Sequence, residues 1–432
     1  MRIEELGEER DRIIERTRLD IEEVRENVQK IINDVKTRGD KAVVEYTRRF
    51  DETELSPQEM EVAEAEIQDA YSKISPTLLK AFQHMKKNLE RFHKFQLITV
   101  GRRIKIESGV ILSRIWRPIE RVGVYIPGGS YPYPSTALMT IVPACVSGVR
   151  EIVVCSPPRY EGSIPSSILV ACHLAGATRI YRIGGAQGIA AMAYGTESVP
   201  KVDKILGPGN IYVTAAKLLI FPEVDIDLPA GPSEVLVIAD ERADPRLIAA
   251  DLISQAEHGP AGASPAILVT DSKPLANRVR NELQQMIEES PNRSEIEASL
   301  NNYGALLVAN DLDSALEFVN EYAPEHLQIM TRKPSKVLDK VINAGTVFLG
   351  PFSPVAVGDY ATGANHVLPT GGFARTQSGL SVDDFIKVMT VQELSKNGLK
   401  QLKETVTTLA DTEGLYAHSK AIEARFQEKE KE

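Results

Sequence analysis

The chain has 432 residues, of which 43% are apolar and 25% charged. This composition is typical of a folded chain about three domains long, and it excludes both a disordered chain and a small scaffold that depends on disulfides. The net charge of −10 disfavours a nucleic-acid partner, and the three cysteines form no CxxC pair, so we expect a protein of the reducing cytoplasm.

The first part of the chain has a helical pattern. Apolar residues follow one face at three- and four-residue steps from Val24 to Val35. The first twenty residues lack the apolar stretch of a secretory signal. The most apolar window, Ala137 to Val146, is too short to cross a bilayer and contains Pro143. We therefore expect neither export nor a membrane partner.

The middle of the chain has the pattern of a parallel sheet. Short apolar runs (VGVYI, EIVVC, RIYRI and KVDKIL) alternate with helical segments and end in turns such as YIPGGS, CSPP, IGGAQG and LGPGN. Such turns meet at the carboxyl edge of a sheet, where these folds bind ligands. Tyr125, Gln187 and Asn210 lie in or beside the turns, so we expect a nucleotide across this edge. The GPGN turn, however, lacks the third glycine of the dinucleotide fingerprint.

A second α/β unit follows Ser233. Its apolar runs are SEVLVIAD, AILVT, GALLVAN and GTVFLG, and helical segments separate them. The segment before Arg121 has no sheet of its own to complete, so we expect it to join this later unit, with the middle unit as an insertion. The charged helical tail from Gly379 onward has few apolar residues, so it must pack on something else.

Four polar residues in the later part of the chain are candidate ligands. Gln255 and His258 lie three residues apart at the end of a predicted helix, which fits either a metal site or a polar helix end. Asp359 shares a glycine-rich loop with His366 and is either an oxygen ligand or part of an Asx turn. With His418, these residues would give two nitrogens and two oxygens, a set compatible with Zn²⁺ or Mn²⁺.

Two further acid and histidine pairs stand out. Glu325 and His326 are adjacent in NEYAPEHLQ, and two proton-transfer groups suit a stepwise oxidation, because an aldehyde must add water before a second hydride can leave. Adjacent Glu-His pairs are also common, and neighbours on a chain need not face the same way. Glu413 and His418 are five residues apart in TEGLYAH, a step slightly longer than one helical turn.

Seven blocks in this order closely resemble the histidinol dehydrogenase family. They are YIPGG, GGAQGIAAMAYGTESVPKVDKILGPGN, AGPSEVLVIAD, SQAEHGP, NEYAPEHL, GDYATGANHVLPTGG and MTVQELS, and the resemblance extends from about Ile21 to His418. It implies a zinc-dependent enzyme with one Zn²⁺ per active site. The implied reaction oxidises L-histidinol through L-histidinaldehyde to L-histidine with two NAD⁺, the last steps of histidine biosynthesis.

The resemblance also implies roles for individual residues. Glu325 would activate water, and His326 would be the general base. The metal ligands would be Gln255, His258, Asp359 and His418. The substrate contacts would be Ser233, Gln255, His258, His326, Asp359, His366, Glu413 and His418. The NAD contacts would be Tyr125, Gln187 and Asn210. Family members are homodimers with exchanged terminal segments, so Glu413 and His418 would complete the site of the partner subunit.

The expected fold class is α/β, with two incomplete Rossmann-like parallel-sheet domains, one inserted in the other, and helical extensions at both ends. The expected domains are an N-terminal extension (1–22), a discontinuous catalytic and metal domain (23–121 and 234–377), an NAD-binding domain (122–233) and a helical C-terminal segment exchanged in the dimer (378–432).

Three alternatives remain at this stage. A zinc- and NAD-dependent dehydrogenase of the same family could act on another small primary alcohol, although Ser233, His366 and Glu413 favour histidinol. A zinc hydrolase could use the same metal ligands with Glu325 as water activator, but it has no use for the glycine turns. A non-catalytic metabolite-binding protein would explain the sheet but leaves the Glu-His pair without a role.

Overall fold

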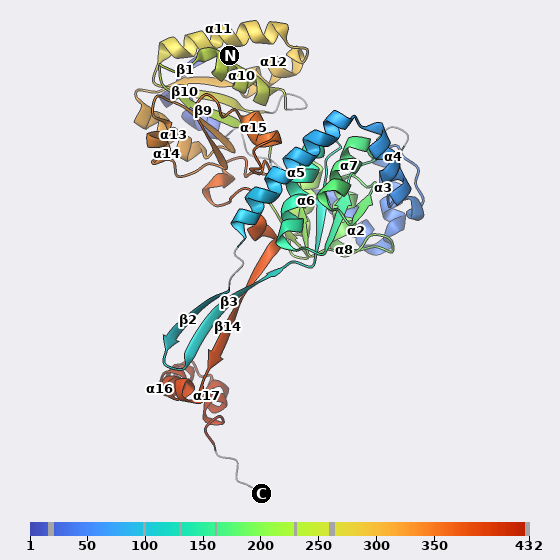
Figure 1. Cartoon of the computed structure of the whole chain (residues 1–432), viewed down its shortest axis with the longest axis vertical. Coiled ribbons are helices and arrows are strands. Elements are labelled where there is room, and N and C mark those ends of the chain that lie inside the picture. The colour runs from blue at the N-terminus through green and yellow to red at the C-terminus, as the bar shows by residue number, and fades with distance from the viewer. Residues whose placement is uncertain are drawn as a thin grey trace. The chain divides into compact units, whose positions relative to one another are not determined.

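The structure is a computed structural model and describes residues 1–15, 21–97, 101–128, 132–159, 162–228, 231–258 and 264–427. The chain forms two compact units (Figure 1). The first combines Met1–Gln96 with Ile119–Phe385, and the second combines Leu97–Pro118 with Ile386–Glu432. Within the described ranges, no helix is both long and apolar enough to cross a membrane.

The middle of the chain forms a five-stranded parallel sheet in the first unit. The spatial order of its strands is β6-β5-β4-β7-β8, which is the order of a dinucleotide-binding fold that stops one strand short. Its strands read as continuous apolar runs because helices cover both faces. The bounds are β4 (Arg121–Tyr125), β5 (Glu151–Cys155), β6 (Arg179–Tyr181), β7 (Lys204–Leu206) and β8 (Asp225–Ile226).

The first unit also contains a six-stranded parallel sheet, in the order β1-β11-β10-β9-β12-β13. Strands β9 to β13 repeat the order of the first sheet, and β1, from the start of the chain, pairs with β11 at one edge. The expected fold class, α/β with two incomplete Rossmann-like sheets, is confirmed. The bounds are β1 (Ile3–Glu5), β9 (Val235–Ala239), β10 (Ala266–Thr270), β11 (Ala305–Val308), β12 (His326–Met330) and β13 (Thr346–Leu349).

Helices cover both faces of the five-stranded sheet (Figure 1). Successive residues of β4 alternate between the two cores: Val124 belongs to one hydrophobic cluster and Tyr125 to the other. One face packs against α2 (Glu22–Arg38), α3 (Asp40–Phe50), α8 (Gly185–Tyr194) and α9 (Ile211–Ile220). The other packs against α4 (Glu64–Lys73), α5 (Pro76–Gln96), α6 (Pro134–Ser147) and α7 (Ser166–Ala175). A short 3-10 helix, η1 (Pro57–Glu59), precedes α4.

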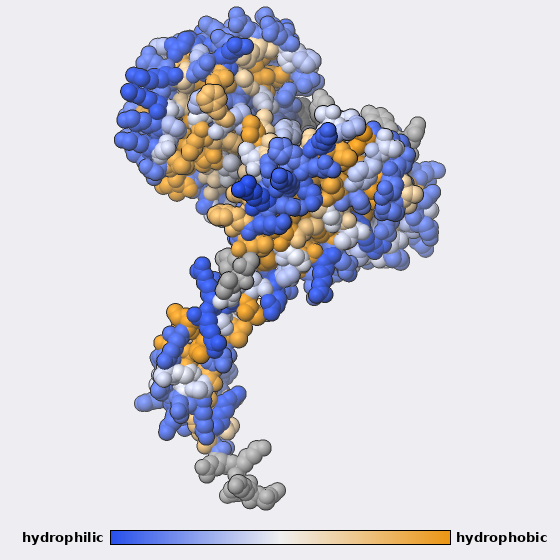
Figure 2. Space-filling model, viewed as in Figure 1, coloured by the Kyte–Doolittle hydropathy of each residue, from blue (hydrophilic) through white to orange (hydrophobic). Residues whose placement is uncertain are grey.

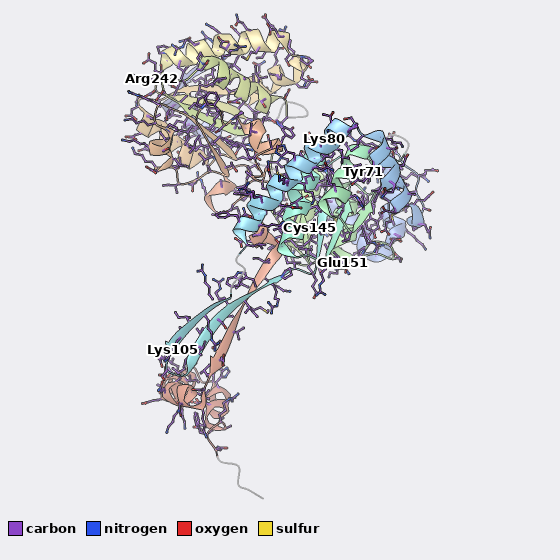
Figure 3. The ribbon with its side chains drawn as sticks, viewed as in Figure 1. Tyr71, Lys80, Lys105, Cys145, Glu151 and Arg242 are labelled. Carbon is purple, nitrogen blue, oxygen red and sulfur yellow. The ribbon has the colours of Figure 1, made fainter. Side chains whose placement is uncertain are left out.

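Contacts between helices also fix this arrangement. Tyr71 of α4, labelled in Figure 3, hydrogen-bonds through its hydroxyl to Nδ1 of His173 on α7 at 3.0 Å. His93 of α5 is buried and hydrogen-bonds through Nδ1 to the Leu89 carbonyl at 2.8 Å. Both histidines therefore have local structural partners.

The six-stranded sheet has its own helical layers. One face packs against α10 (Pro245–Ala256), α11 (Lys273–Glu289) and α12 (Arg293–Asn302). The other packs against α1 (Leu6–Glu15), α13 (Leu312–Tyr322) and α14 (Pro334–Leu338). The rest of the unit contains α15 (Val355–Tyr360), η2 (Phe373–Arg375) and η3 (Val382–Phe385).

The N-terminal helices share their cores with the five-stranded sheet, whereas the sequence pattern grouped residues 23–121 with the later sheet. The apolar stripe of α2, with Val28 and Ile32, lies in the same cluster as Ala186 and Ile189 of α8. The reason is that a parallel sheet needs helices on both faces, and the N-terminal helices enlarge both layers of the first one. The domain boundaries themselves remain a prediction.

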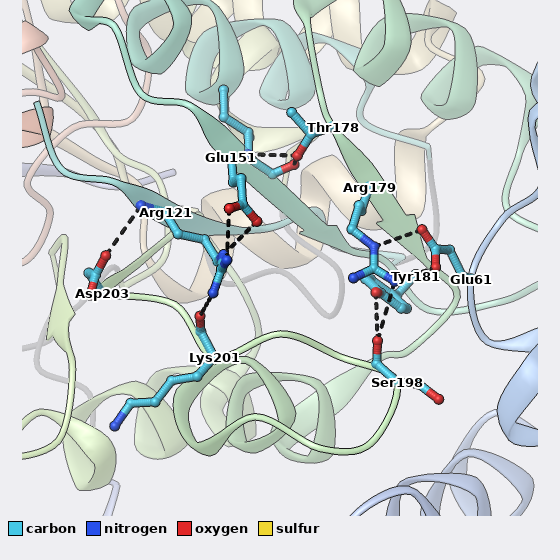
Figure 4. Close-up of polar contacts among 10 residues, drawn as sticks. Glu61, Arg121, Glu151, Thr178, Arg179, Tyr181, Ser198, Lys201 and Asp203 are labelled. Carbon is cyan, nitrogen blue, oxygen red and sulfur yellow. Dashed lines mark hydrogen bonds and ion pairs between the residues drawn. The ribbon is translucent and has the colours of Figure 1, made fainter.

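Ion pairs join the strands at the amino edge of the five-stranded sheet (Figure 4). Arg121 at the start of β4 donates two 2.7 Å hydrogen bonds to the carboxylate of Glu151 at the start of β5. Arg179 at the start of β6 donates to the carboxylate of Glu61, and the nearby Tyr181 hydroxyl donates to the Ser198 carbonyl. These contacts occupy the edge opposite the glycine-rich turns.

The second unit is an antiparallel sheet with two helices and a small core. In its described part, four residues are buried: Val110, Gly398, Ala410 and Ser419. Apolar side chains are visible on its surface among charged ones such as Lys105 (Figures 2 and 3). The exposed apolar residues include Ile104, Leu409 and Tyr416. The elements are β2 (Arg102–Glu107), β3 (Val110–Pro118), β14 (Ile386–Leu394), α16 (Lys396–Thr412) and α17 (Tyr416–Glu423).

Candidate active site

A cavity of about 1510 Å³ in the first unit lies where the two sheets meet. It is lined from the carboxyl ends of β4 and β7 and from the amino ends of β9 and β12, because Tyr125 ends β4 and His326 begins β12. Nine of the candidate site residues line it: Tyr125, Gln187, Asn210, Ser233, His258, Glu325, His326, Asp359 and His366. The topology therefore brings residues from very different parts of the chain to one cavity.

Glu325 is held in the cavity wall by two hydrogen bonds to one carboxylate oxygen. The Ser233 hydroxyl donates to Glu325 Oε2 at 2.7 Å, and the backbone N–H of Glu234 donates to the same atom at 2.7 Å. Glu325 is 5% exposed, so its carboxylate has a fixed orientation.

His326 is oriented by the same short segment. Its Nδ1 lies 3.0 Å from the Glu234 carbonyl and 3.4 Å from Glu325 Oε2. Burial alone would lower the pKa of His326, but the charge and hydrogen bond of Glu325, with the charge of Asp359, outweigh burial and raise the pKa to about 9. With Nδ1 donating to the backbone carbonyl, Nε2 is the nitrogen that exchanges protons in the cavity.

The main chain before this pair has a tight conformation. Ala323 ends α13 in the left-handed region with φ 52°, where a side chain is unfavourable, and its N–H donates to the Val319 carbonyl at 2.9 Å. On the neighbouring segment, a Cβ at Gly345 would lie 2.6 Å from the Glu325 carbonyl oxygen. Glycine at position 345 therefore allows the two segments to approach.

An acid and two histidines line another wall of the cavity. Asp359 on α15 is 9% exposed, and its Oδ1 lies 3.7 Å from His366 Nδ1. Burial lowers the pKa of His366, and the charge of Asp359 acts against that shift. His258, which follows α10, is half-buried and lines the same cavity.

Gln255 lies in the last turn of α10 and is 3% exposed, but it is not among the residues that line the cavity. Its Nε2 atom is buried without a hydrogen-bond partner in the described part of the chain. Within that part, no three His, Cys, Asp or Glu side chains are grouped closely enough to hold a metal ion. The donor types of Gln255, His258 and Asp359, and the orphaned amide of Gln255, nevertheless fit a borderline metal such as Zn²⁺.

The three candidate cofactor residues surround the turns at the edge of the five-stranded sheet. The Tyr125 hydroxyl accepts from the Gly185 N–H at 3.0 Å, and burial raises the pKa of Tyr125. Gln187 is buried on α8, and its Nε2 lies 3.5 Å from Asp51 Oδ2. Asn210 caps α9, since its side chain accepts from the Val213 N–H at 3.1 Å. Gly129 and Ser130 of the first glycine turn lie outside the described residues.

Glu413 and His418 belong to the second unit. Glu413 follows α16, and His418 is on α17. Both side chains are exposed. The His418 N–H donates to the Leu415 carbonyl at 2.9 Å, which fixes the start of α17.

Comparison with known proteins decides the family. The sequence model of the family described as histidinol dehydrogenase matches residues 14–426. The chain belongs to the histidinol dehydrogenase family. The histidinol dehydrogenase of Methanothermobacter thermautotrophicus is 49% identical over 416 residues, covering 96% of each chain. That of Lactococcus lactis is 45% identical over 94% of each chain. The crystal structure of histidinol dehydrogenase from Elizabethkingia anophelis is 40% identical, with a TM-score of 0.93 over 98% of this chain and 97% of that chain.

Membership of the histidinol dehydrogenase family makes this chain an enzyme, an oxidoreductase of histidine biosynthesis in a family that depends on NAD in general. The hydrolase and the non-catalytic binding protein are thereby set aside. The cavity is the candidate active site, because it contains acid, base and nucleotide-edge residues together.

One polar residue of this histidinol dehydrogenase site is absent from the sequence-based prediction. Glu234 is 1% exposed, and its carboxylate accepts from the Tyr322 hydroxyl at 2.6 Å, the Gly371 N–H at 3.2 Å and the Glu325 N–H at 3.3 Å. Burial, with the nearby charge of Glu325, raises the pKa of Glu234 to about 7 despite the hydrogen bond from Tyr322. The available signal was a lone acid at the head of the all-apolar strand VLVIA.

Proposed function

We propose that the enzyme oxidises L-histidinol through L-histidinaldehyde to L-histidine in this cavity, with two NAD⁺ consumed per product. The observation that carries this proposal is that one dipeptide, Ser233-Glu234, holds both Glu325 and His326 in place. The pair lines the same cavity as residues of the glycine turns. NAD⁺ supplies the hydride acceptor for each of the two oxidations. Tyr125, Gln187 and Asn210 are the residues proposed to contact it.

The proposed roles follow from the geometry of the pair. His326 takes the hydroxyl proton of the alcohol through Nε2, since Nδ1 is held by the Glu234 carbonyl. Glu325 takes a proton from the water that adds to the aldehyde. Ser233, Glu234 and His326 all face Oε2 of Glu325, so Oε1 is the oxygen assigned to the water. As water adds, the protonated His326 returns its proton to the aldehyde oxygen, and the hydrate forms. His326 then takes a hydroxyl proton of the hydrate while the carbon gives up the second hydride to NAD⁺. The acid formed loses its last proton to solvent, and histidine leaves as the carboxylate.

The proposal includes one Zn²⁺, or Mn²⁺, per site. Gln255, His258 and Asp359 would hold it together with His418 of a partner copy. When bound, the metal would anchor the substrate through its nitrogen donors. The other proposed substrate contacts are Ser233, His326, His366 and Glu413.

A homodimer with exchanged terminal segments is part of the same proposal. The second unit buries very few residues of its own and exposes Leu409 and Tyr416, so a second copy would supply the surface that covers it. Glu413 and His418 would then complete the partner's site. We also propose a cytoplasmic location, which the three free thiols support.

One assay tests the proposed reaction. Purified protein is incubated with L-histidinol and NAD⁺, and NADH and L-histidine are both quantified. We expect two NADH per histidine, with no accumulation of aldehyde. Faster turnover of another small primary alcohol would mean that this alcohol, and not histidinol, is the substrate. An absence of NAD⁺ reduction with any alcohol would refute the proposed reaction.

A further inference from the structure

A buried ion pair lies next to the turn that follows β7, at the carboxyl edge of the five-stranded sheet. Lys217 on α9 and Asp227 after β8 contact each other, and their side chains are 3% and 2% exposed. Removing two charges from water is costly, and only close contact with further hydrogen bonds offsets that cost. The position of the pair therefore calls for a physical explanation, and the proposed chemistry uses neither side chain.

All three donors of the Lys217 ammonium have acceptors. One faces Asp227, one the Gly207 carbonyl at 3.0 Å and one the Leu228 carbonyl at 3.0 Å. Asp227 Oδ2 in turn accepts from the Gly207 N–H at 2.7 Å. The two ends of the ion pair therefore hold both the N–H and the carbonyl of Gly207.

Gly207 is the residue on which the turn depends. Its φ is +115°, and a Cβ at this position would lie 2.1 Å from the Tyr125 carbonyl oxygen. The turn thus lies directly on the end of β4, and the residues after it, Pro208 to Asn210, line the cavity. The contact with Leu228 ties the same turn to the segment that leads to Ser233.

We propose that Lys217 and Asp227 are positioning residues that hold the Gly207–Asn210 turn in the conformation that receives the cofactor. This inference rests on the proposed function, which assigns NAD⁺ to that turn. An apolar pair would fill the same space, but it could hold neither polar group of Gly207. The role of the ion pair is therefore to orient the turn, in addition to any contribution it makes to the stability of the sheet.

The test separates orientation from folding. Full-length Lys217→Met, Asp227→Leu and the double variant are compared by urea unfolding and by calorimetric titration with NAD⁺. The Lys217→Met variant leaves a carboxylate buried without its partner, so it loses both stability and NAD⁺ affinity. The double variant leaves no lone charge, so it regains most of the lost stability.

The decisive quantity is the NAD⁺ affinity of the double variant. We expect its dissociation constant to stay at least about tenfold above that of the parent. At saturating NAD⁺, kcat stays within about threefold of the parent and KM for histidinol is unchanged. Lys204→Met is the matched control, because Lys204 is a buried lysine of the same sheet that pairs with Asp225 at 3.1 Å, at the far end of β7. It loses stability without a change in NAD⁺ affinity.

Several outcomes would overturn the inference. A stable double variant that binds NAD⁺ as tightly as the parent would refute it. If the double variant does not fold, Lys217→Arg decides, because arginine keeps the charge but cannot place its donors on the same three oxygens. Its control is Lys204→Arg. If Lys217→Arg binds NAD⁺ as tightly as this control, the inference is refuted. A parent enzyme that does not bind NAD⁺ would instead refute the proposed function.

Discussion

The Tyr322 hydroxyl donates a 2.6 Å hydrogen bond to Glu234 Oε2, and this buried pair joins the end of α13 to the start of β9. The backbone of Glu234 in turn contacts both members of the candidate catalytic pair, through its N–H to Glu325 and its carbonyl to His326. A carboxyl group shielded from water therefore lies immediately behind the proposed chemistry.

The first prediction concerns stability against pH. The pKa of Glu234 is raised from 4.5 to about 7, chiefly by burial. The folded protein therefore binds more protons than the unfolded chain between these values. The contribution of Glu234 to the free energy of unfolding is complete below about pH 4.5 and is lost as the pH rises through 7. Its size is on the order of 3 kcal/mol.

The Glu234→Gln variant should lose this pH dependence. We expect urea unfolding of the variant to change less between pH 5 and 7 than that of the parent. Above this window both proteins should lose stability alike up to about pH 9, because the pKa of His326 is raised to about 9 by a different residue, Glu325. Equal slopes for the two proteins between pH 5 and 7 would show that Glu234 does not titrate there.

The second prediction concerns activity against pH. His326 must be neutral to take a proton from the alcohol, and its pKa is about 9 in the free protein. Measured as kcat/KM for histidinol, activity should therefore rise from pH 7 to about 9. In Glu325→Gln the charge that raises the pKa is gone, so the rise of the residual activity should move to lower pH. If the pH profile of Glu325→Gln is the same as that of the parent, the titration of His326 does not cause the rise in activity.

The third prediction separates the two oxidations. Glu325→Gln should slow the oxidation of histidinaldehyde by at least about 100-fold, which is the lower range for a lost general base, and should slow the oxidation of histidinol less. Stopped-flow measurement of NADH from each substrate tests this. Glu321→Gln is the control, because Glu321 lies four residues earlier and is partly exposed; both steps should keep the parental rates. Equal losses in both steps would argue against water activation by Glu325.

The fourth prediction concerns the metal. Chelation should abolish activity, and Zn²⁺ or Mn²⁺ should restore it. His258→Ala should contain less metal than the parent by elemental analysis, whereas His84→Ala, a change of an exposed histidine on α5, should contain the parental amount. Full activity in metal-free protein would remove the metal from the proposal.

The fifth prediction concerns the sharing of sites between subunits. His418→Ala and His258→Ala should each be nearly inactive as homodimers. When the two are mixed, a mixed dimer contains one site with both histidines intact, so up to about a quarter of the parental activity should return in a statistical mixture. One variant is labelled with ¹⁵N, so that native mass spectrometry can verify that mixed dimers have formed. Verified mixed dimers without recovered activity would show that the exchanged arrangement is wrong.

The sheet and its edges could be predicted because they depend on local patterns. A run such as VGVYI is apolar at every position only if both faces are covered, and the Pro-Gly-Gly turn that follows it places Tyr125 near a strand end. β1 could not be predicted, because the three residues Ile3–Glu5 carry no periodicity and become a strand only through pairing with β11. The sequence also could not show which sheet α2 packs against, because its apolar stripe would fit either sheet and the contact joins distant parts of the chain.

The site divides in the same way. Glu325 and Asp359 were candidates from their surroundings in the sequence, and the family resemblance implied their roles, whereas Glu234, Lys217 and Asp227 were not candidates. Glu234 gains its role from Tyr322, 88 residues away. Lys217 and Asp227 become a pair only because α9 and β8 bring them together around Gly207. Gln255, which the sequence placed with His258, is buried but does not line the cavity. Sequence spacing reports which residues share a helix turn and not which of them reach the cavity.

The left-handed conformation of Ala323 has a consequence for protein engineering. A glycine would fit this backbone better by about 1 kcal/mol, so a search for heat-tolerant variants would select it readily. Because Pro324 and Glu325 follow directly, the same exchange would loosen the base of the turn on which water activation is proposed to depend. Gains in melting temperature at this position should therefore come with slower turnover, and screens should score both quantities together.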